Sequence, residues 1–418
     1  MPFKPKLITL PNKATVLLVH DPKSPTVLLD FFVHIGSRFE KKSEMGLSHV
    51  LEHMLFKGSQ KYPSPFAVST AVDSLGANYN ASTDKEITSY HAQVSARHLD
   101  KAFDIFSDIF LRPKFMEAEY EREKKVIVEE LKMYYENPAS HIGDLADEAF
   151  YGDSPLGWNV GGTAKAVLGF SHEALLNYYK KYYIGANTTL VVAGKFDEKK
   201  VLALAKKSIG QLPAGKKAVA VPAPKIKQNF VFDDRKLNQV NLVMGWERPG
   251  GLYKDDAVYS FLATLLGGMM SSRLFMAIRE KRGLCYSIRA GQSVFADSGH
   301  FNISAGLDCS RIKEAATAIW QELELLKKIA PAKEEIRKIL DYKLGKMDLA
   351  LRTVEDYAGW YAGQYATERK WRTVEEWEKM LKKVTASDIQ RLAQKLFKPS
   401  TCVVAAIGSK LKKSDFTL

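Results

Sequence analysis

The chain of 418 residues contains only three cysteines, Cys285, Cys309 and Cys402, and no two of them form a Cys-x-x-Cys pair. An odd number of widely spaced cysteines argues against a disulfide framework and against a cysteine metal site. A reducing compartment suits this composition. We therefore expect the protein in the cytoplasm, and a leader removed by processing is the alternative.

Long apolar runs are also missing. The first residues, Met1 to Lys6, lack the apolar stretch of a signal peptide. No later run approaches the roughly 20 apolar residues that cross a bilayer, which excludes a membrane span. Hydrophobic residues still make up 46% of the chain, which is ample for burial. Because one core rarely grows beyond about 250 to 300 residues, a chain of 418 residues predicts at least two domains.

Basic residues outnumber acidic ones, but they form no run with interleaved aromatic residues. The chain has 61 Lys and Arg against 48 Asp and Glu, a formal net charge of +13. Such a charge would steer acidic peptides or anionic surfaces toward the protein, or it reflects a lysine-rich solvated surface, which we favour because lysine and glutamate alternate in several segments. We expect no nucleic-acid partner.

The segment His49-Val50-Leu51-Glu52-His53 carries the clearest chemical signal. In a helix, side chains at positions i and i+4 leave the same face about one turn apart, so His49 and His53 can bind one metal ion. Glu52 lies on nearly the same face. It can accept a proton from a water bound to the ion without being a ligand itself. This arrangement indicates hydrolysis.

The neighbours of this motif are mostly apolar, which predicts a buried helix. Polar side chains left unpaired on such a helix would each cost roughly 1 to 3 kcal/mol, so they need partners. A divalent cation satisfies all of them. The alternative is a pair of core histidines bonded to carbonyl oxygens, but the spacing of two histidines with a glutamate favours the metal.

A catalytic zinc ion normally has three protein ligands and one open position, so a third ligand must come from elsewhere. The segment from about Glu117 to Glu136 reads as a charged helix that stops at Asn137-Pro138. Of its adjacent acids, Glu130 has more apolar helical neighbours than Glu129, so we choose Glu130. Glu123, two turns earlier, could orient a ligating histidine through its free ring nitrogen, or it is a solvated helix charge.

These residues resemble the inverted zincin signature of the pitrilysin family of metallopeptidases, and the resemblance spans nearly the whole chain. It implies zinc on His49, His53 and Glu130, with Glu52 as the base. Family members also carry an acid seven residues before the glutamate ligand, which Glu123 matches. The segment 76–83 is similar to the family's edge strand, which implies that Asn80 and Ala81 lie along a bound peptide that adds as an extra strand.

A second match lies in the segment 266–286, which is similar to the C-terminal signature of the same family. Without the family, an arginine and a tyrosine near a glycine-rich turn would be interpreted as structural. The resemblance implies that Arg279 and Tyr286, seven residues apart, reach the active site and hold the substrate carbonyl, and both are donors suited to an oxyanion. Some relatives divide the two motifs between subunits, whereas this chain has both, so a homodimer suffices and a related partner remains possible.

The clearest boundary is the Pro-, Ala- and Lys-rich stretch 213–229, which predicts a linker between residues 1–212 and 230–418. The flanks echo each other: 27–33 resembles 240–244, and 190–194 resembles 402–406, which indicates an internal duplication. Each half starts with strands, continues with long amphipathic helices and ends on a β-branched strand. This pattern predicts an α+β sandwich, a sheet covered by helices. The resemblance implies two homologous domains arranged as a clamshell. The second half has no histidines around Ser260 to Leu266, so we expect one Zn²⁺ per chain.

The sequence therefore predicts a zinc-dependent endopeptidase that hydrolyses extended or unstructured peptides inside a chamber between two domains, with Glu52 as the general base. Two alternatives come from other classes of protein. The chain could be an inactive structural subunit, but such members usually lack an intact metal motif. It could also be a peptide-binding partner that completes the active site of a second subunit through Arg279 and Tyr286.

Overall fold

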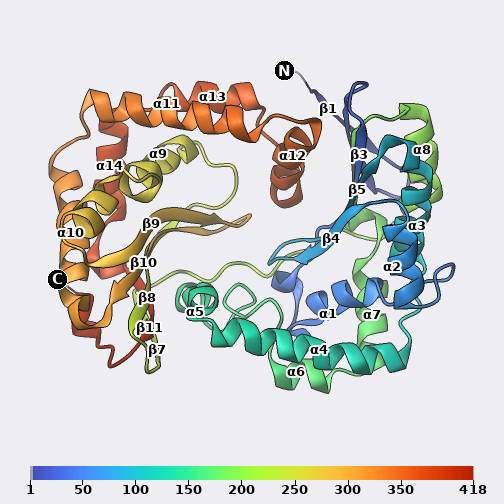
Figure 1. Ribbon diagram of the computed structural model, residues 1–418, viewed down its shortest axis with the longest axis horizontal. Coiled ribbons are helices and arrows are strands. Elements are labelled where there is room, and N and C mark those ends of the chain that lie inside the picture. Colours follow the sequence, from blue (N-terminus) through green and yellow to red (C-terminus); the bar gives the residue numbers. More distant parts are fainter. Residues whose placement is uncertain (1–2, 418) are drawn as a thin grey trace. The chain divides into compact units, whose positions relative to one another are not determined.

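The computed structural model describes residues 3–417, which divide into two compact units (Figure 1). Of the described residues, unit 1 contains 3–133 and the segments Trp158–Val221 and Ala350–Trp371. Unit 2 contains Tyr134–Gly157, Pro222–Leu349 and residues 372–417. Each unit has its own sheet and its own hydrophobic core.

The sheet of unit 1 consists of β1 (Pro5–Thr9), β2 (Thr15–His20), β3 (Thr26–Val33), β4 (Asn78–Thr83), β5 (Thr88–Ser95) and β6 (Thr188–Gly194). Their order across the sheet is β1-β2-β6-β3-β5-β4. Only β2 and β6 run parallel, and the other neighbouring strands are antiparallel. Strand β4 therefore forms one edge of this sheet.

The sheet of unit 2 consists of β7 (Asn229–Asp234), β8 (Gln239–Arg248), β9 (Cys285–Val294), β10 (Gly299–Asp308) and β11 (Val403–Gly408). Their order is β7-β11-β8-β10-β9, and only β7 and β11 run parallel. This order repeats that of β2-β6-β3-β5-β4, with the same parallel pair at the same place. A shared topology is what the internal duplication predicts.

The helices of unit 1 are α1 (Leu47–Leu55), α2 (Pro65–Asp73), α3 (Leu99–Leu111), α6 (Ala164–Gly169), α7 (His172–Tyr182), α8 (Glu198–Lys207) and α12 (Val354–Glu368). Helix α4 (Glu117–Glu136) lies in unit 1 except for its last turn. Buried aromatic residues recur on α3 at helical spacing, with Phe103, Phe106 and Phe110 each at most 1% exposed. They join the strands in one core.

The helices of unit 2 are α5 (Pro138–Tyr151), α9 (Asp256–Gly267), α10 (Ile312–Lys328), α11 (Lys333–Ala350), α13 (Val374–Leu381) and α14 (Ala386–Leu396). Helices α9, α10 and α14 cover one face of the second sheet (Figure 1). The α+β class predicted from the sequence, two mixed sheets covered by helices, is confirmed. None of the helices in residues 3–417 is both long and apolar enough to cross a bilayer.

Each unit is completed by a helix from the other half of the sequence. Helix α5 packs its Leu145 and Phe150 against Val243 and Val403 on the second sheet. Helix α12 packs on β2 and β6 of the first sheet. The compact units therefore differ from the contiguous segments 1–212 and 230–418. Each sheet has an apolar face that a helix must cover, and the covering helix need not come from the same half of the sequence. The chain passes between units at Val221 and Pro222, within the expected linker 213–229.

Candidate metal centre

Helix α1 is fixed at its first turn. Gly46 precedes it with φ +103°, and a Cβ there would lie 2.6 Å from the carbonyl oxygen of Gly161. The buried carboxyl of Glu40 accepts hydrogen bonds from the backbone N–H groups of Gly46 and Ser48, each over 2.7 Å. These bonds satisfy N–H groups that have no partner within the helix. The direction of α1, and of the side chains on it, is thereby set.

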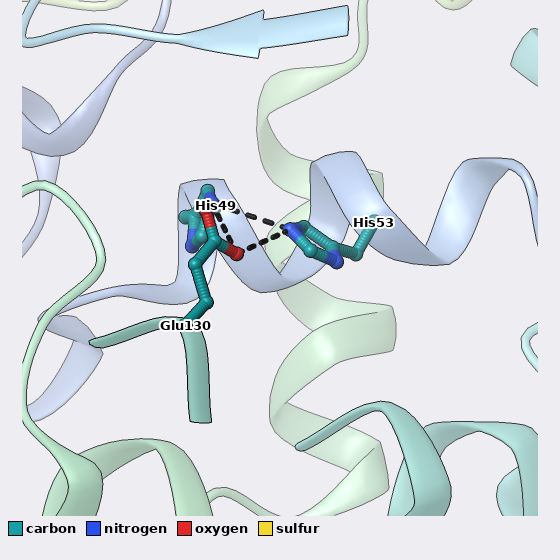
Figure 2. A group of neighbouring side chains, drawn as sticks. All are labelled: His49, His53 and Glu130. Carbon is teal, nitrogen blue, oxygen red and sulfur yellow. Dashed lines mark hydrogen bonds and ion pairs between the residues drawn. The ribbon is translucent and has the colours of Figure 1, made fainter. Parts of the chain in front are cut away.

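The structure brings His49, His53 and Glu130 together (Figure 2). The two Nε2 atoms lie 3.3 Å apart, and Oε2 of Glu130 lies 3.4 Å from Nε2 of His53 and 3.8 Å from Nε2 of His49. The histidines come from α1 and the glutamate from α4. In residues 3–417 this is the only group of three His, Cys, Asp or Glu side chains whose ligand atoms converge within 4.8 Å.

Helix α4 presents its two adjacent acids to different surroundings. Glu130 is half-buried and faces the histidines. Glu129 is 71% exposed and pairs with Lys132, three residues along the same helix. The acid with the more apolar helical neighbours is thus the one beside the imidazoles.

Glu123 lies one step farther from the cluster. Its Oε1 accepts a hydrogen bond from Nδ1 of His53 over 2.9 Å, and its Oε2 lies 2.8 Å from Nζ of Lys57. Burial opposes the charge of Glu123, but its bonds to His53 and Lys57 outweigh burial and lower its pKa. An ionised Glu123 only accepts, so Nδ1 of His53 carries a hydrogen, and in the neutral ring the lone pair that a metal ion needs is then on Nε2. We therefore describe Glu123 as a side chain that orients His53.

The electrostatics of His49, His53 and Glu130 favour a positive charge at the point where the three side chains meet. Burial lowers the pKa of His53, but its hydrogen bonds to Glu123 and Glu130 outweigh burial and raise the pKa. Burial and the neighbouring His53 lower the pKa of His49, whose ring therefore offers a lone pair. Two imidazoles and one carboxylate form the ligand set of hydrolytic zinc sites, which keep one position open. The residues present therefore fit a zinc ion.

Glu52 stands beside the cluster and is not one of its converging groups. Burial raises the pKa of Glu52, while a hydrogen bond from Thr83 and the charge of His53 lower it. The hydroxyl of Thr83 donates to Oε2 of Glu52 over 2.6 Å. A buried carboxylate with a raised pKa is a stronger base than a solvated one, which suits proton transfer.

Asn80 and Ala81 lie on β4, the edge strand that also carries Thr83. The backbone N–H of Ala81 donates to the side-chain oxygen of Asn80 over 2.9 Å. The edge of the sheet is therefore linked through Thr83 to Glu52 and so to helix α1. An added strand at this edge would run beside the candidate site.

Arg279 and Tyr286 lie in unit 2, where they are neighbours. Arg279 belongs to a π-helical turn, Phe275–Glu280, and its guanidinium lies 4.7 Å from the ring centre of Phe275 and 5.5 Å from that of Tyr286. Tyr286 is 76% exposed. Arg279 also lines a cavity of about 930 Å³ beside β9. Both side chains are thus available to a ligand, and their role at the metal site stays a prediction.

Sequence reasoning missed two contacts of the site, those of Thr83 and Lys57. Lys57 follows His53 by four residues but lies in the turn after α1, so a helix extended by one turn in the sequence analysis could have indicated its place beside Glu123. Thr83 follows Asn80 and Ala81 on the edge strand, but its bond to Glu52 joins residues from a helix and a strand that only the fold brings together.

Family sequence models match both halves of the chain. The family sequence model described as Insulinase (Peptidase family M16) matches residues 15–164, which include the whole metal cluster. The model described as Peptidase M16 inactive domain matches residues 169–342, which include Arg279 and Tyr286. The two matches follow one another along the chain, as the two halves of the duplication do.

Relatives of similar length bear the name zinc protease. An "uncharacterized zinc protease" of Rickettsia felis is 33% identical over 401 residues, which cover 94% of this chain and 95% of that protein. The "uncharacterized zinc protease YmxG" of Bacillus subtilis is 29% identical over 394 residues, with coverages of 94% and 95%. The crystal structure of a protease from Helicobacter pylori has a TM-score of 0.87 at 21% identity, covers 98% of this chain and 100% of that one, and shows the shared fold.

Proposed function

Because this chain belongs to peptidase family M16, the pitrilysin family, we propose that it is a zinc-dependent endopeptidase that cuts extended or unstructured peptides. The convergence of His49, His53 and Glu130, with the carboxyl of Glu52 beside them, carries this proposal. The names of the relatives support the metal and the class of reaction.

Each side chain of the site has a separate task. A zinc ion held by His49, His53 and Glu130 would polarise the scissile carbonyl and lower the pKa of water toward about 7. Glu52 takes the proton of the attacking water and passes it to the leaving amine, the task of a general acid and base. Glu123 holds the imidazole of His53 in one orientation and one tautomer.

We propose that the substrate binds along β4. An extended peptide can pair its backbone with a free strand edge, as in other cases of β-strand addition, and Asn80 and Ala81 lie on this strand. Peptides with free backbone groups can bind in this way, whereas folded proteins have most of these groups already paired. Binding along β4 would therefore give a preference for extended or unstructured substrates.

We propose that Arg279 and Tyr286 hold the substrate carbonyl as its oxygen gains negative charge. The guanidinium and the phenol are both hydrogen-bond donors, and preorganised donors stabilise an oxyanion strongly. The guanidinium of Arg279 lies 4.7 Å from the ring centre of Phe275, and this cation–π contact favours one position of the guanidinium, which supports such preorganisation. Since one chain carries both motifs, two identical copies suffice, and we propose a homodimer rather than a pair with a related subunit. Sedimentation analysis of the purified chain tests this.

The function is tested by E52Q, which keeps the size of the side chain and removes the base. This variant should bind zinc and fold as the wild type does, but its turnover of an unstructured peptide should fall at least about 100-fold, because acid–base catalysis contributes about that much. E129Q, the same change at an exposed position, is the control. Unimpaired cleavage by E52Q would refute the assignment of the base. A zinc-loaded wild type without activity would favour a non-catalytic partner subunit.

A further inference from the structure

The edge strand β4 alternates between exposed and half-buried side chains. Asn78, Asn80 and Ser82 are exposed, whereas Tyr79, Ala81 and Thr83 are half-buried. Thr83, the last residue of β4, turns its hydroxyl to Glu52 and donates a hydrogen bond to Oε2 over 2.6 Å. One strand therefore offers its edge and holds the carboxyl of the base.

The hydrogen bond makes the two oxygens of Glu52 unequal. A carboxylate has two equivalent oxygens, and its terminal torsion is broad, so an unrestrained glutamate can present either one. With one lone pair of Oε2 engaged by Thr83, Oε1 is the oxygen favoured to accept a proton. Threonine suits this task because its β-branched side chain has few χ1 rotamers, so the backbone of β4 sets the direction of the hydroxyl.

We propose that Thr83 is a positioning residue of the reaction, which fixes the reactive oxygen of Glu52 and ties its position to the strand along which the peptide binds. This inference rests on the proposed function, because it assumes that Glu52 is the base and that β4 receives the substrate. It assigns to the edge strand a second task besides binding. A peptide that pairs with β4 orders the same strand that aims the base.

A purely structural role would look different. If the hydroxyl only provided a partner for a buried carboxyl, its loss would lower stability and leave turnover at saturating substrate intact. If it positions the base, its loss lowers kcat and leaves KM nearly unchanged, because the interaction matters in the transition state rather than in binding. Small displacements of a reacting group cost up to about 100-fold in rate.

The test compares T83V and T83S with the wild type in the zinc-loaded full-length protein. T83V keeps the shape and removes the hydroxyl, and it should lower kcat tenfold to a hundredfold with KM within twofold and zinc content unchanged. T83S restores the hydroxyl and should recover kcat to within about threefold of the wild type. The matched control is T26V, which removes another Thr-to-Glu hydrogen bond, that from Thr26 to Glu355 at 2.5 Å in the same unit, and should leave kcat unchanged.

A second readout needs no activity. In crystal structures of the metal-free proteins, the carboxyl of Glu52 should have one orientation in the wild type and T83S and more than one in T83V. The proposal would be overturned if kcat of T83V were within twofold of the wild type, or if kcat of T83S were as low as that of T83V. In either case an inactive E52Q would still support the proposed function. If the wild type cleaves no peptide, the function fails, and an unchanged Glu52 in T83V would then overturn the positioning role as well.

Discussion

Nδ1 of His53 donates a hydrogen bond to Glu123 over 2.9 Å, which ties helix α1, the helix of the two clustered histidines, to helix α4. The bond leaves Nε2 of His53 free to face Glu130, 3.4 Å away. Outer partners of this kind orient a ligand and raise its basicity. Lys57, just past the end of α1, Glu123 and His53 thus form a row of paired polar groups that leads to the candidate zinc site.

We predict that E123Q binds zinc tenfold to a hundredfold more weakly than the wild type, because a neutral amide stabilises His53 less than a carboxylate does. Competition with a chromophoric chelator measures this affinity. E129Q changes an exposed glutamate of the same helix and should leave it unaltered. An affinity of E123Q within twofold of the wild type would show that Glu123 is only a helix charge.

We predict a smaller loss of zinc affinity, severalfold, for K57M. Lys57 acts on His53 only through Glu123, which it holds ionised across 2.8 Å. The double variant K57M/E123Q should therefore bind zinc no more weakly than E123Q alone, since residues in one network are not additive. Chelator competition with the wild type, both single variants and the double variant gives a complete double-mutant cycle. If the losses of zinc affinity were additive, Lys57 would not act through Glu123.

We predict that G46A lowers the free energy of unfolding by about 3 kcal/mol. Alanine is strained at a positive φ, with a cost of roughly 1 to 3 kcal/mol, and its Cβ would lie 2.6 Å from a carbonyl oxygen of Gly161. The control is G76A, where φ is +60° and nothing lies within 4 Å, so that strain alone remains. Urea unfolding compares the two variants, and equal losses would show that the contact with Gly161 can relax.

Stability should depend on pH through Asp30. Burial raises the pKa of Asp30 to about 7, although a hydrogen bond from Ser89 lowers it. The folded state therefore keeps a proton that the unfolded state loses near pH 4, so Asp30 contributes stability at low pH that disappears as the pH rises to about 7. D30N lacks this titration. Relative to the wild type it should gain of the order of 4 kcal/mol between pH 4 and 8, and a pH-independent difference in urea unfolding would exclude the raised pKa.

Local patterns in the sequence predict several elements of this structure correctly. Helix α4 spans Glu117–Glu136 and ends before Pro138, as its composition predicts. The apolar neighbours of Glu130 place it on the face that meets His53, because helical spacing alone decides which side chains share a face. Repeated strand segments likewise predict two similar sheets, and the strand orders match.

Contacts between distant segments could not be predicted in this way. The bond between Thr83 and Glu52 depends on how a strand edge packs against α1, which no local spacing encodes. The exchange of α5 and α12 between the halves escapes sequence reasoning for a similar reason, since either helix could have covered the sheet of its own half. The roles of Arg279 and Tyr286 are predicted only by the family resemblance. No spacing of residues in the sequence indicates them.

The most direct test of this account is the zinc content of the purified wild-type chain, measured together with digestion of an unstructured peptide mixture read by mass spectrometry. The account predicts one zinc ion per chain, held by His49, His53 and Glu130, and cleavage that stops with a chelator and returns with added zinc. Protein without stoichiometric zinc, or cleavage that a chelator does not affect, would contradict it.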